Sequence, residues 1–324
     1  MTDEHLTRRD FLKLSSLAPF SKLETLMGLI DTNEMIKRYV SDRETLAYPT
    51  LARKNPLTAE GLEKTTRVPS ESEMIEKLNN PDFFTKSING ARPIHTNQFD
   101  DTEHNFHPDM PESEADIIKQ NSCGPAAIAT VLKTYRYFET GVVADIRISA
   151  VRDFLEQHKY IEKGKKHNFL EWDGSMYPFA LTQAFSLFSQ FGYPISVVNI
   201  SPSRMSGYGL DSFIVPLNRD IVLRSQELAS KGGILCTFQL KYGGGHLPLM
   251  TNLNYDEDGM IRAMVIDSRG GFVQENVWLP SYIDDYNGKD GLMGIFGIIP
   301  NFKQKNMSSL RMDKHERIKG NPFN

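Results

Sequence analysis

Cysteine is scarce in this chain, which has only Cys123 and Cys236 among its 324 residues. Two cysteines cannot form the disulfide framework of a small secreted domain, although a single Cys123–Cys236 bond stays an alternative. Long apolar runs are lacking too, and none approaches the roughly 20 uncharged residues of a membrane-spanning helix, so we expect no membrane span. The net charge of −4 gives no basic excess. We therefore expect no nucleic-acid partner.

The composition that remains is that of a globular protein, with 40% hydrophobic and 24% charged residues. A chain of this length has ample core for one large or two small domains. Helical patterns come first and strand patterns after them, which predicts an α+β fold. Helices are expected over 178–191 and 219–230, and strands over 234–240, 246–255, 260–268, 271–274 and 292–300.

The segment Gln120–Leu132 has the pattern of a helix entrance with a cysteine at its start. Pro125 suits the first turn, and an apolar face follows it. Ser122 and Asn121 are candidate caps for the free N–H groups. Cys123 would then lie at the positive end of the helix dipole, which favours a nucleophilic thiolate. Read alone, it could equally be an inert core cysteine.

A nucleophilic cysteine needs a base, and His246 is the best candidate. It follows Gly243–Gly245, which allow close approach of backbone or substrate, and it begins an apolar strand. Asp267 ends the next predicted strand, after a turn at Asp256–Gly259. In such a hairpin, the carboxylate could face His246 and orient the imidazole. The alternatives are a hydrogen-bonded hairpin histidine and an aspartate that serves the turn.

Cys-Gly-Pro-Ala-Ala from Cys123, Gly-Gly-His ending at His246, and Asp267 closing the next strand together resemble the papain-like cysteine peptidases. The most similar branch is family 39, the bacteriocin-processing-peptidase-like group, over roughly residues 111–300. The resemblance implies a papain-like fold, with N-terminal helices packed on a C-terminal antiparallel sheet. It implies Cys123 as nucleophile, His246 as base and Asp267 as the orienting residue. The implied reaction is hydrolysis of a peptide or amide bond in a peptide or protein substrate, through a thioester and without a cofactor.

The chain departs from this family at the oxyanion-hole glutamine, which usually stands six residues before the cysteine. Ile117 occupies that position here, and the nearest glutamine is Gln120. Gln120 is therefore our candidate oxyanion donor, together with the Cys123 N–H. Two alternatives stay open: a non-catalytic papain-like binding module, and an amidase or acyltransferase acting on a cell-wall or other non-protein amide.

Segments outside residues 111–300 have separate interpretations. Thr7–Lys13 resembles the twin-arginine signal of bacteria, so we assign 1–30 to an export signal and expect a periplasmic or extracellular protein. The alternative is an amphipathic helix on a cytoplasmic protein. Residues 31–110 are read as a linker or arm that could cover the active site as a pro-segment would. Residues 301–324 are read as a flexible tail. The sequence does not indicate an oligomeric state.

Three histidines, His95, His104 and His107, lie close together in the sequence, beside acidic residues. A metal site is one reading, because imidazole and carboxylate are common ligands. We favour a solvated loop and expect no metal, since no regular element would hold these side chains in place. The acidic neighbours are Asp100, Asp101 and Glu103.

Val277–Ile283 resembles the short tryptophan-bearing helix of the same peptidase family. Trp278 could serve there as a core anchor or as a platform for substrate. We favour the core anchor, because a tryptophan has a large apolar area to bury.

Overall fold

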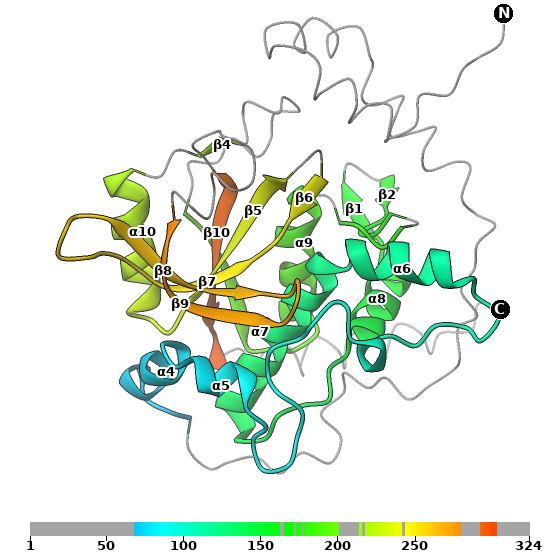
Figure 1. Cartoon of the computed structure of the whole chain (residues 1–324), viewed down its shortest axis with the longest axis horizontal. Helices are drawn as coiled ribbons and strands as arrows, with labels where there is room; N and C mark the ends of the chain where they lie inside the picture. The colour runs from blue at the N-terminus through cyan, green and yellow to red at the C-terminus, as the bar shows by residue number, and fades with distance from the viewer. Residues whose placement is uncertain are drawn as a thin grey trace, which may run out of the picture.

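The computed structural model describes residues 68–162, 165–171, 173–176, 178–200, 214–215, 218–241, 244–279 and 292–302 (Figure 1). The predicted signal at 1–30 lies outside the described residues, and so does the tail from residue 303 onward. Of the predicted arm at 31–110, only the part from residue 68 is described.

Helices dominate the first half of the described chain and strands the second, which confirms the α+β prediction. The helices are α4 (Glu71–Leu78), α5 (Pro81–Thr85), η1 (Asp101–Glu103), α6 (Glu112–Asn121), α7 (Cys123–Thr140), α8 (Ile148–Gln157), α9 (Pro178–Gln190) and α10 (Arg219–Ala229). The strands are β1 (Tyr160–Glu162), β2 (Lys165–His167), β3 (Ile195–Asn199), β4 (Ile214–Val215), β5 (Ile234–Lys241), β6 (Gly244–His246), β7 (Leu249–Tyr255), β8 (Ile261–Asp267), β9 (Phe272–Trp278) and β10 (Leu292–Pro300).

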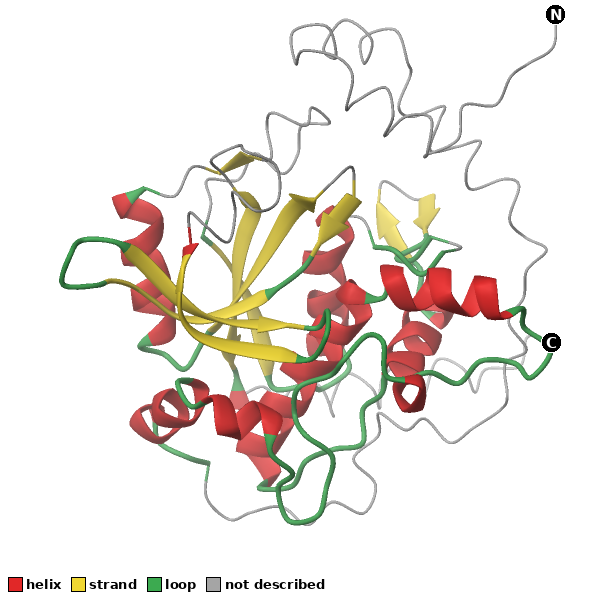
Figure 2. Cartoon of the chain, viewed as in Figure 1, coloured by secondary structure: helices red, strands yellow, loops and turns green. Residues whose placement is uncertain are grey.

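The main sheet has the strand order β3-β10-β5-β7-β8-β9, and each neighbouring pair along it is antiparallel (Figure 2). β4 pairs with β10, and β6 pairs with β5. Alternate residues of β5 face opposite layers, as the period of two in a strand requires. Ile234 and Cys236 join the core cluster that contains α7, α8 and α9, whereas Leu235 joins a second cluster with α10. The sheet therefore lies between two apolar layers.

α7 is the central helix of the larger core, and nearly all of its residues are buried. Its alanines and leucine favour a helix, and Gly141 ends it in the left-handed conformation with φ 73°. The Tyr135 hydroxyl lies 3.0 Å from the Gly232 carbonyl oxygen and 2.6 Å from that of Ile298, and can donate to either. These contacts hold the far end of α7 against the sheet, so the position of Cys123 at its near end is tied to the core.

α4 and α5 belong to the folded body, although the sequence assigns them to an arm. Ser70 and Glu73 form the reciprocal capping box at the start of α4. Phe83 and Phe84 of α5, and Ile94 after it, are buried in the same cluster as α7. Figure 1 shows both helices beside the β9 edge of the sheet, in agreement with the contacts between α5 and β9.

The prediction for Trp278 is wrong. β9 continues through this residue, and the indole is 40% exposed. Val277 and Trp278 belong to the strand because both pair with β8, and helical backbone begins only at Leu279. The rest of the predicted helix, from residue 280, lies outside the described residues.

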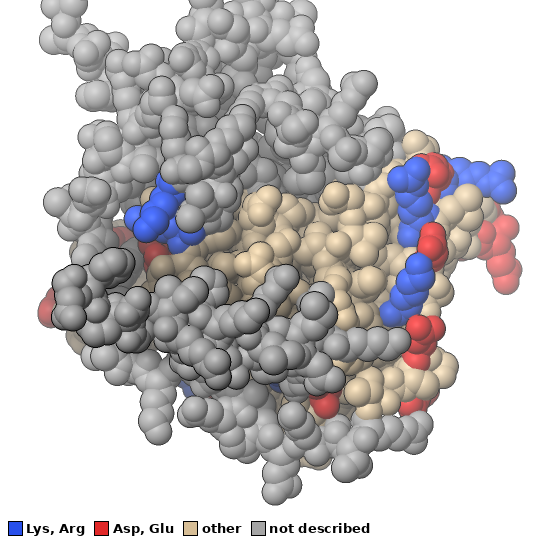
Figure 3. Space-filling view, turned by 180° about the vertical axis from the view of Figure 1, so that it is seen from behind, with Lys and Arg blue, Asp and Glu red and all other residues tan. Residues whose placement is uncertain are grey.

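Acidic and basic side chains are interleaved along one edge of the back face in Figure 3. Two pairs with a spacing of four residues lie along α10 and the turn after it, Asp220 with Arg224 at 3.0 Å and Glu227 with Lys231 at 2.7 Å. Pairs at this spacing support an exposed helix face.

Among the described helices, none is long and apolar enough to cross a membrane.

Candidate active site

Cys123 is the first residue of α7, directly after the end of α6 and the connecting residue Ser122. The predicted capping is wrong, because no side chain caps α7. The Ser122 hydroxyl donates to the Ile118 carbonyl at 2.6 Å, and the Asn121 amide donates to that of Ile117 at 2.9 Å. Both side chains are used by the preceding helix because α6 runs almost directly into α7. The start of α7 beside the thiol therefore keeps its first N–H groups without a side-chain acceptor.

Gly124 allows a neighbouring loop to pack on this helix entrance. A Cβ at this position would lie 2.8 Å from the sulfur of Met176. In the same loop, Gly174 has φ +84° and packs against Ile118 and Ser122. Only a residue without a side chain fits at both places, so the Cys-Gly pair serves packing as well as chemistry.

His246 and Asp267 meet as the hairpin predicts. His246 ends β6, Asp267 ends β8, and the imidazole Nε2 lies 2.7 Å from the carboxylate Oδ1. The imidazole is only 1% exposed, and Asp267 is also buried. Such a short contact inside the protein is that of a charge-assisted hydrogen bond.

Cys123 completes the constellation through a hydrogen bond with the His246 side chain. Burial alone would lower the pKa of His246, but hydrogen bonds to Asp267 and Cys123, together with the charges of both, raise the pKa to about 9. His246 is therefore an imidazolium at neutral pH. Since Nε2 contacts the carboxylate, Nδ1 is the nitrogen that can exchange a proton with the thiol.

Asp267 is itself held from two directions. The Arg269 N–H donates to its Oδ1 at 2.7 Å, and the His95 Nε2–H donates to its backbone carbonyl at 2.9 Å. Burial lowers the pKa of His95 to about 4, more than its hydrogen bond to Asp267 raises it. His95 is thus neutral at physiological pH, which fixes it as a donor of one proton to this carbonyl.

The prediction of a solvated loop around the histidines is correct for His107, which is exposed, and wrong for the other two. His95 and His104 are buried, and His104 donates from Nε2 to the Gln98 carbonyl at 2.8 Å. Burial also lowers the pKa of His104 to about 4. In the part of the chain that the structure describes, no group of three His, Cys, Asp or Glu side chains could hold a metal ion. The sequence offered no local signal for the His95 contact, because its partner Asp267 lies 172 positions further along the chain.

Gln120, the candidate oxyanion donor, is exposed near the end of α6. Its backbone carbonyl accepts a hydrogen bond from the Gln98 amide at 3.0 Å. Its own side chain has no hydrogen bond among the described residues, and Ile117 in the family's glutamine position is 38% exposed. No described hydrogen bond therefore orients the Gln120 side chain.

Both cysteines are free, so the alternative of a Cys123–Cys236 disulfide is wrong. Cys236 is fully buried in β5, and burial raises the pKa of its thiol well above the ordinary value. Cys123 is only partly buried. The two thiols should therefore differ strongly in access to a reagent.

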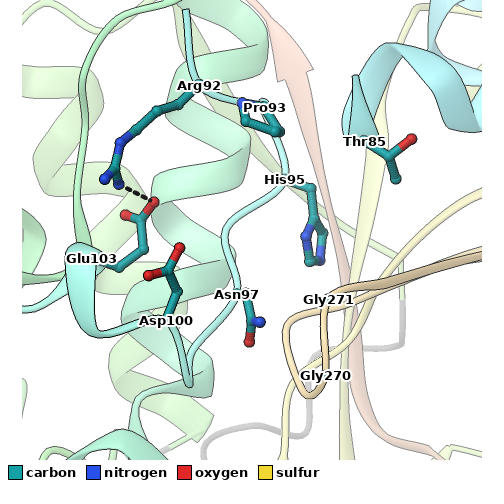
Figure 4. Close-up of a pocket in the computed structure, with 9 residues that line it drawn as sticks. All are labelled: Thr85, Arg92, Pro93, His95, Asn97, Asp100, Glu103, Gly270 and Gly271. Atoms are coloured by element: carbon teal, nitrogen blue, oxygen red, sulfur yellow. Dashed lines mark hydrogen bonds and ion pairs between the residues drawn. The ribbon is translucent and has the colours of Figure 1, made fainter. Parts of the chain in front are cut away.

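A separate cavity of about 460 Å³ lies between the His95 segment and the Gly270–Gly271 turn (Figure 4). Arg92 donates to Glu103 Oε1 at 2.9 Å along one wall, and the Gly270–Gly271 turn lies opposite. His95 lines this cavity and also contacts Asp267. The remaining lining residues are Thr85, Pro93, Asn97 and Asp100. Cys123 and His246 are not among the lining residues, so this space is not the reaction site.

In comparisons with known proteins, no family model matches this chain and no curated protein matches its sequence. Any functional conclusion therefore depends on the residues and their geometry. The contact that carries most weight is the buried His246–Asp267 pair beside the Cys123 thiol.

Proposed function

We propose that the chain is a cysteine hydrolase with a papain-like fold, which cleaves a peptide or amide bond through Cys123, His246 and Asp267. The observation that carries this proposal is the imidazole held between a carboxylate at 2.7 Å and a thiol at a helix start. A structural histidine needs no thiol partner, whereas a nucleophile, its base and an orienting acid need this order.

In the proposed reaction, the Cys123 thiolate attacks the carbonyl carbon and forms a tetrahedral oxyanion. The His246 imidazolium then gives its proton to the leaving amine, the C–N bond breaks and a thioester remains. Water, deprotonated by the neutral imidazole, attacks the thioester. The thiolate leaves as the acid product forms, and the proton stays on His246. Asp267 keeps the charged imidazole oriented throughout.

The oxyanion is expected to lie against the start of α7. The uncapped N–H groups there and the helix dipole both favour a negative charge. Gln120 stays a candidate second donor, since an exposed side chain three residues before Cys123 can turn toward a bound substrate.

A non-catalytic binding module is the second candidate function. One observation favours it: Ile117 stands six residues before Cys123, where the peptidase family has its glutamine. An amidase or acyltransferase would use the same residues as the hydrolase and differ in the amide it accepts or in the acceptor that replaces water.

Alkylation of Cys123 by iodoacetamide separates a reactive site from a binding module. At about pH 6, a free thiol is less than about 1% thiolate, so it reacts slowly. A thiolate paired with the His246 imidazolium should react at least about tenfold faster there. His246→Ala should lose this excess. His158→Ala is the matched control, because the His158 ring hydrogen-bonds to the Phe154 carbonyl and packs against Phe154 and Phe191 rather than against the site.

The labelled peptide must contain Cys123, since Cys236 is buried. Wild-type labelling at the rate of a free thiol, indifferent to His246→Ala, would leave a papain-like fold used for binding. Fast labelling would justify screening peptide and cell-wall amide substrates, with loss of turnover in Cys123→Ala as the second test.

We also propose export through the twin-arginine-like segment at Thr7–Lys13. The two adjacent arginines at fixed positions before an apolar stretch support it. Replacing Arg8 and Arg9 together with lysine should move the protein from the exported fraction to the cytoplasm. A protein found in the cytoplasm with or without the change would contradict the proposal.

A further inference from the structure

We propose that Gln98 is a positioning residue, which fixes the start of the Cys123 helix relative to the strand end that carries Asp267. The inference rests on the proposed function, because it concerns the same three side chains. Gln98 lies in the segment 95–104, which we term the brace, between the two parts of the site. It is 0% exposed.

On the nucleophile side, the Gln98 amide donates to two consecutive backbone carbonyls. Its Nε2 lies 3.2 Å from the Lys119 oxygen and 3.0 Å from the Gln120 oxygen. These are the last turn of α6, three and four residues before Cys123. The Gln98 side chain therefore binds the backbone that leads directly into the nucleophile.

On the acid side, Gln98 contacts the residue that follows Asp267. The Ser268 hydroxyl donates to its Oε1 at 2.9 Å, and its backbone N–H donates to the Ser268 carbonyl at 2.9 Å. Ser268 is buried as well. One side chain thus bridges two segments that are almost 150 residues apart in sequence and meet only at the site.

Glutamine is suited to this bridge because its amide has a donor end and an acceptor end. The donor end meets two carbonyls and the acceptor end meets a hydroxyl, so the orientation of the amide is fixed by its partners. A glutamate would place negative charge against the carbonyls of α6, and an apolar side chain would leave buried groups unpaired.

The brace is itself anchored beside Gln98. The Thr96 N–H donates to Thr130 Oγ1 of α7 at 3.1 Å, and Lys133 Nζ donates to Thr96 Oγ1 at 2.8 Å. His95, which directly precedes Thr96, donates a hydrogen bond to the Asp267 carbonyl. The backbone around Gln98 is therefore fixed to α7. The Gln98 side chain in turn holds Ser268, and with it the end of β8 that carries Asp267, in place relative to α7.

Gln98→Met tests the proposal, because methionine keeps the length of the side chain and removes its hydrogen bonds. We expect Cys123 alkylation at about pH 6 to fall on the order of tenfold, since small misplacement of reacting groups is costly. The pH profile of alkylation should move toward that of a free thiol. Ser268→Ala removes only the hydrogen bond from the Ser268 hydroxyl to Gln98 Oε1. It should move the pH profile in the same direction by a smaller amount.

Tyr135→Phe is the matched control, since it removes a buried hydroxyl that contacts two backbone carbonyls at the far end of α7. It should change thermal stability but leave the pH profile of Cys123 alkylation within about twofold of the wild type. All variants are compared at a temperature where circular dichroism shows them folded.

If the pH profile of Cys123 alkylation in both Gln98→Met and Ser268→Ala equals that of the wild type, the positioning role is overturned. The proposed function would then still stand. An equal shift in Tyr135→Phe would also overturn it, because loss of stability would then be the cause. If Gln98→Met does not fold, Ser268→Ala decides alone. Wild-type protein that labels as a free thiol, regardless of His246→Ala, overturns the proposed function and this inference with it.

Discussion

Asp267→Asn is the substitution that tests most directly how the site works. Asparagine keeps the shape of the side chain and can still accept from the Arg269 N–H, but it carries no charge. The hydrogen bond to the carboxylate is the largest single contact that favours the charged form of His246. Without it, burial acts on the imidazole with only Cys123 to oppose it, so we expect the pKa of His246 to fall well below about 9.

The size of the effect follows from the pKa. The rise from 6.5 to about 9 corresponds to about 3 kcal/mol of stabilisation of the folded state at about 1.4 kcal/mol for each pH unit. Because the folded pKa is raised, this stabilisation is fully present below pH 6.5 and is lost as the pH rises through about 9. Asp267→Asn removes the part of this rise that comes from the carboxylate, so it should cost on the order of 1–3 kcal/mol in slightly acidic solution and much less in alkaline solution.

Two measurements check this prediction. Urea unfolding of wild type and Asp267→Asn, at a series of pH values, gives the difference in the free energy of unfolding. An NMR titration of the imidazole signals, assigned with His246→Ala, gives the pKa directly. A stability difference that stays constant with pH, or that grows toward alkaline pH, would refute the charge pair as the cause of the shift.

Two other predictions concern packing and acid stability. Gly124→Ala should destabilise the protein by about 1–3 kcal/mol in thermal unfolding, since the added Cβ would lie 2.8 Å from the Met176 sulfur; Gly124→Ala combined with Met176→Ala should recover part of the loss, and additive losses would contradict the contact. His95 and His104 have folded pKa values lowered to about 4, so the stability they contribute is present above pH 6.5 and is lost as the pH falls through about 4. His104→Gln should therefore make the acid decline of the unfolding free energy shallower, and an unchanged slope in urea titrations would count against a buried neutral histidine.

Local patterns were sufficient to predict most of the strand and helix positions. The turn at Asp256–Gly259 is one case, because Asp256 Oδ1 accepts from the N–H groups of Asp258 and Met260 and Gly259 has φ +75°. A hairpin of known turn brings the end of one strand near the start of its partner. The approach of His246 to Asp267 could be predicted for this reason, from residues only 21 positions apart.

The contacts of the brace could not be predicted in the same way. Gln98 and His95 are bonded to residues about 170 positions further along the chain, and nothing in their own sequence neighbourhood indicates a partner. The polar composition of 95–104 is typical of a loop. Burial of its polar groups is possible only because each finds a partner in the folded structure, which is a property of the tertiary arrangement.

The prediction that Ser122 and Asn121 cap α7 was wrong for a related reason. Ser122 and Asn121 have the right chemistry for caps, but sequence alone does not show that α6 continues through Asn121. Once α6 is in place, its last carbonyls are the nearest acceptors, and both side chains turn backward. The prediction used the correct capping propensities of serine and asparagine. It did not include the carbonyl groups of α6, which compete for the same two side chains.

The same contacts bear on the idea that residues 31–110 act as a removable pro-segment. Removal of the described part, from residue 68, would take away the donor to the Asp267 carbonyl and every partner of Ser268 in the brace. It would also take away Phe83 and Phe84, which are buried in the core, and so expose the face of α7 on which Phe83 stacks at Phe138. A pro-segment covers a finished site and leaves it intact when it goes. Residues 95–104 instead supply buried hydrogen bonds on both sides of the site, so we expect the site to require them in its active form.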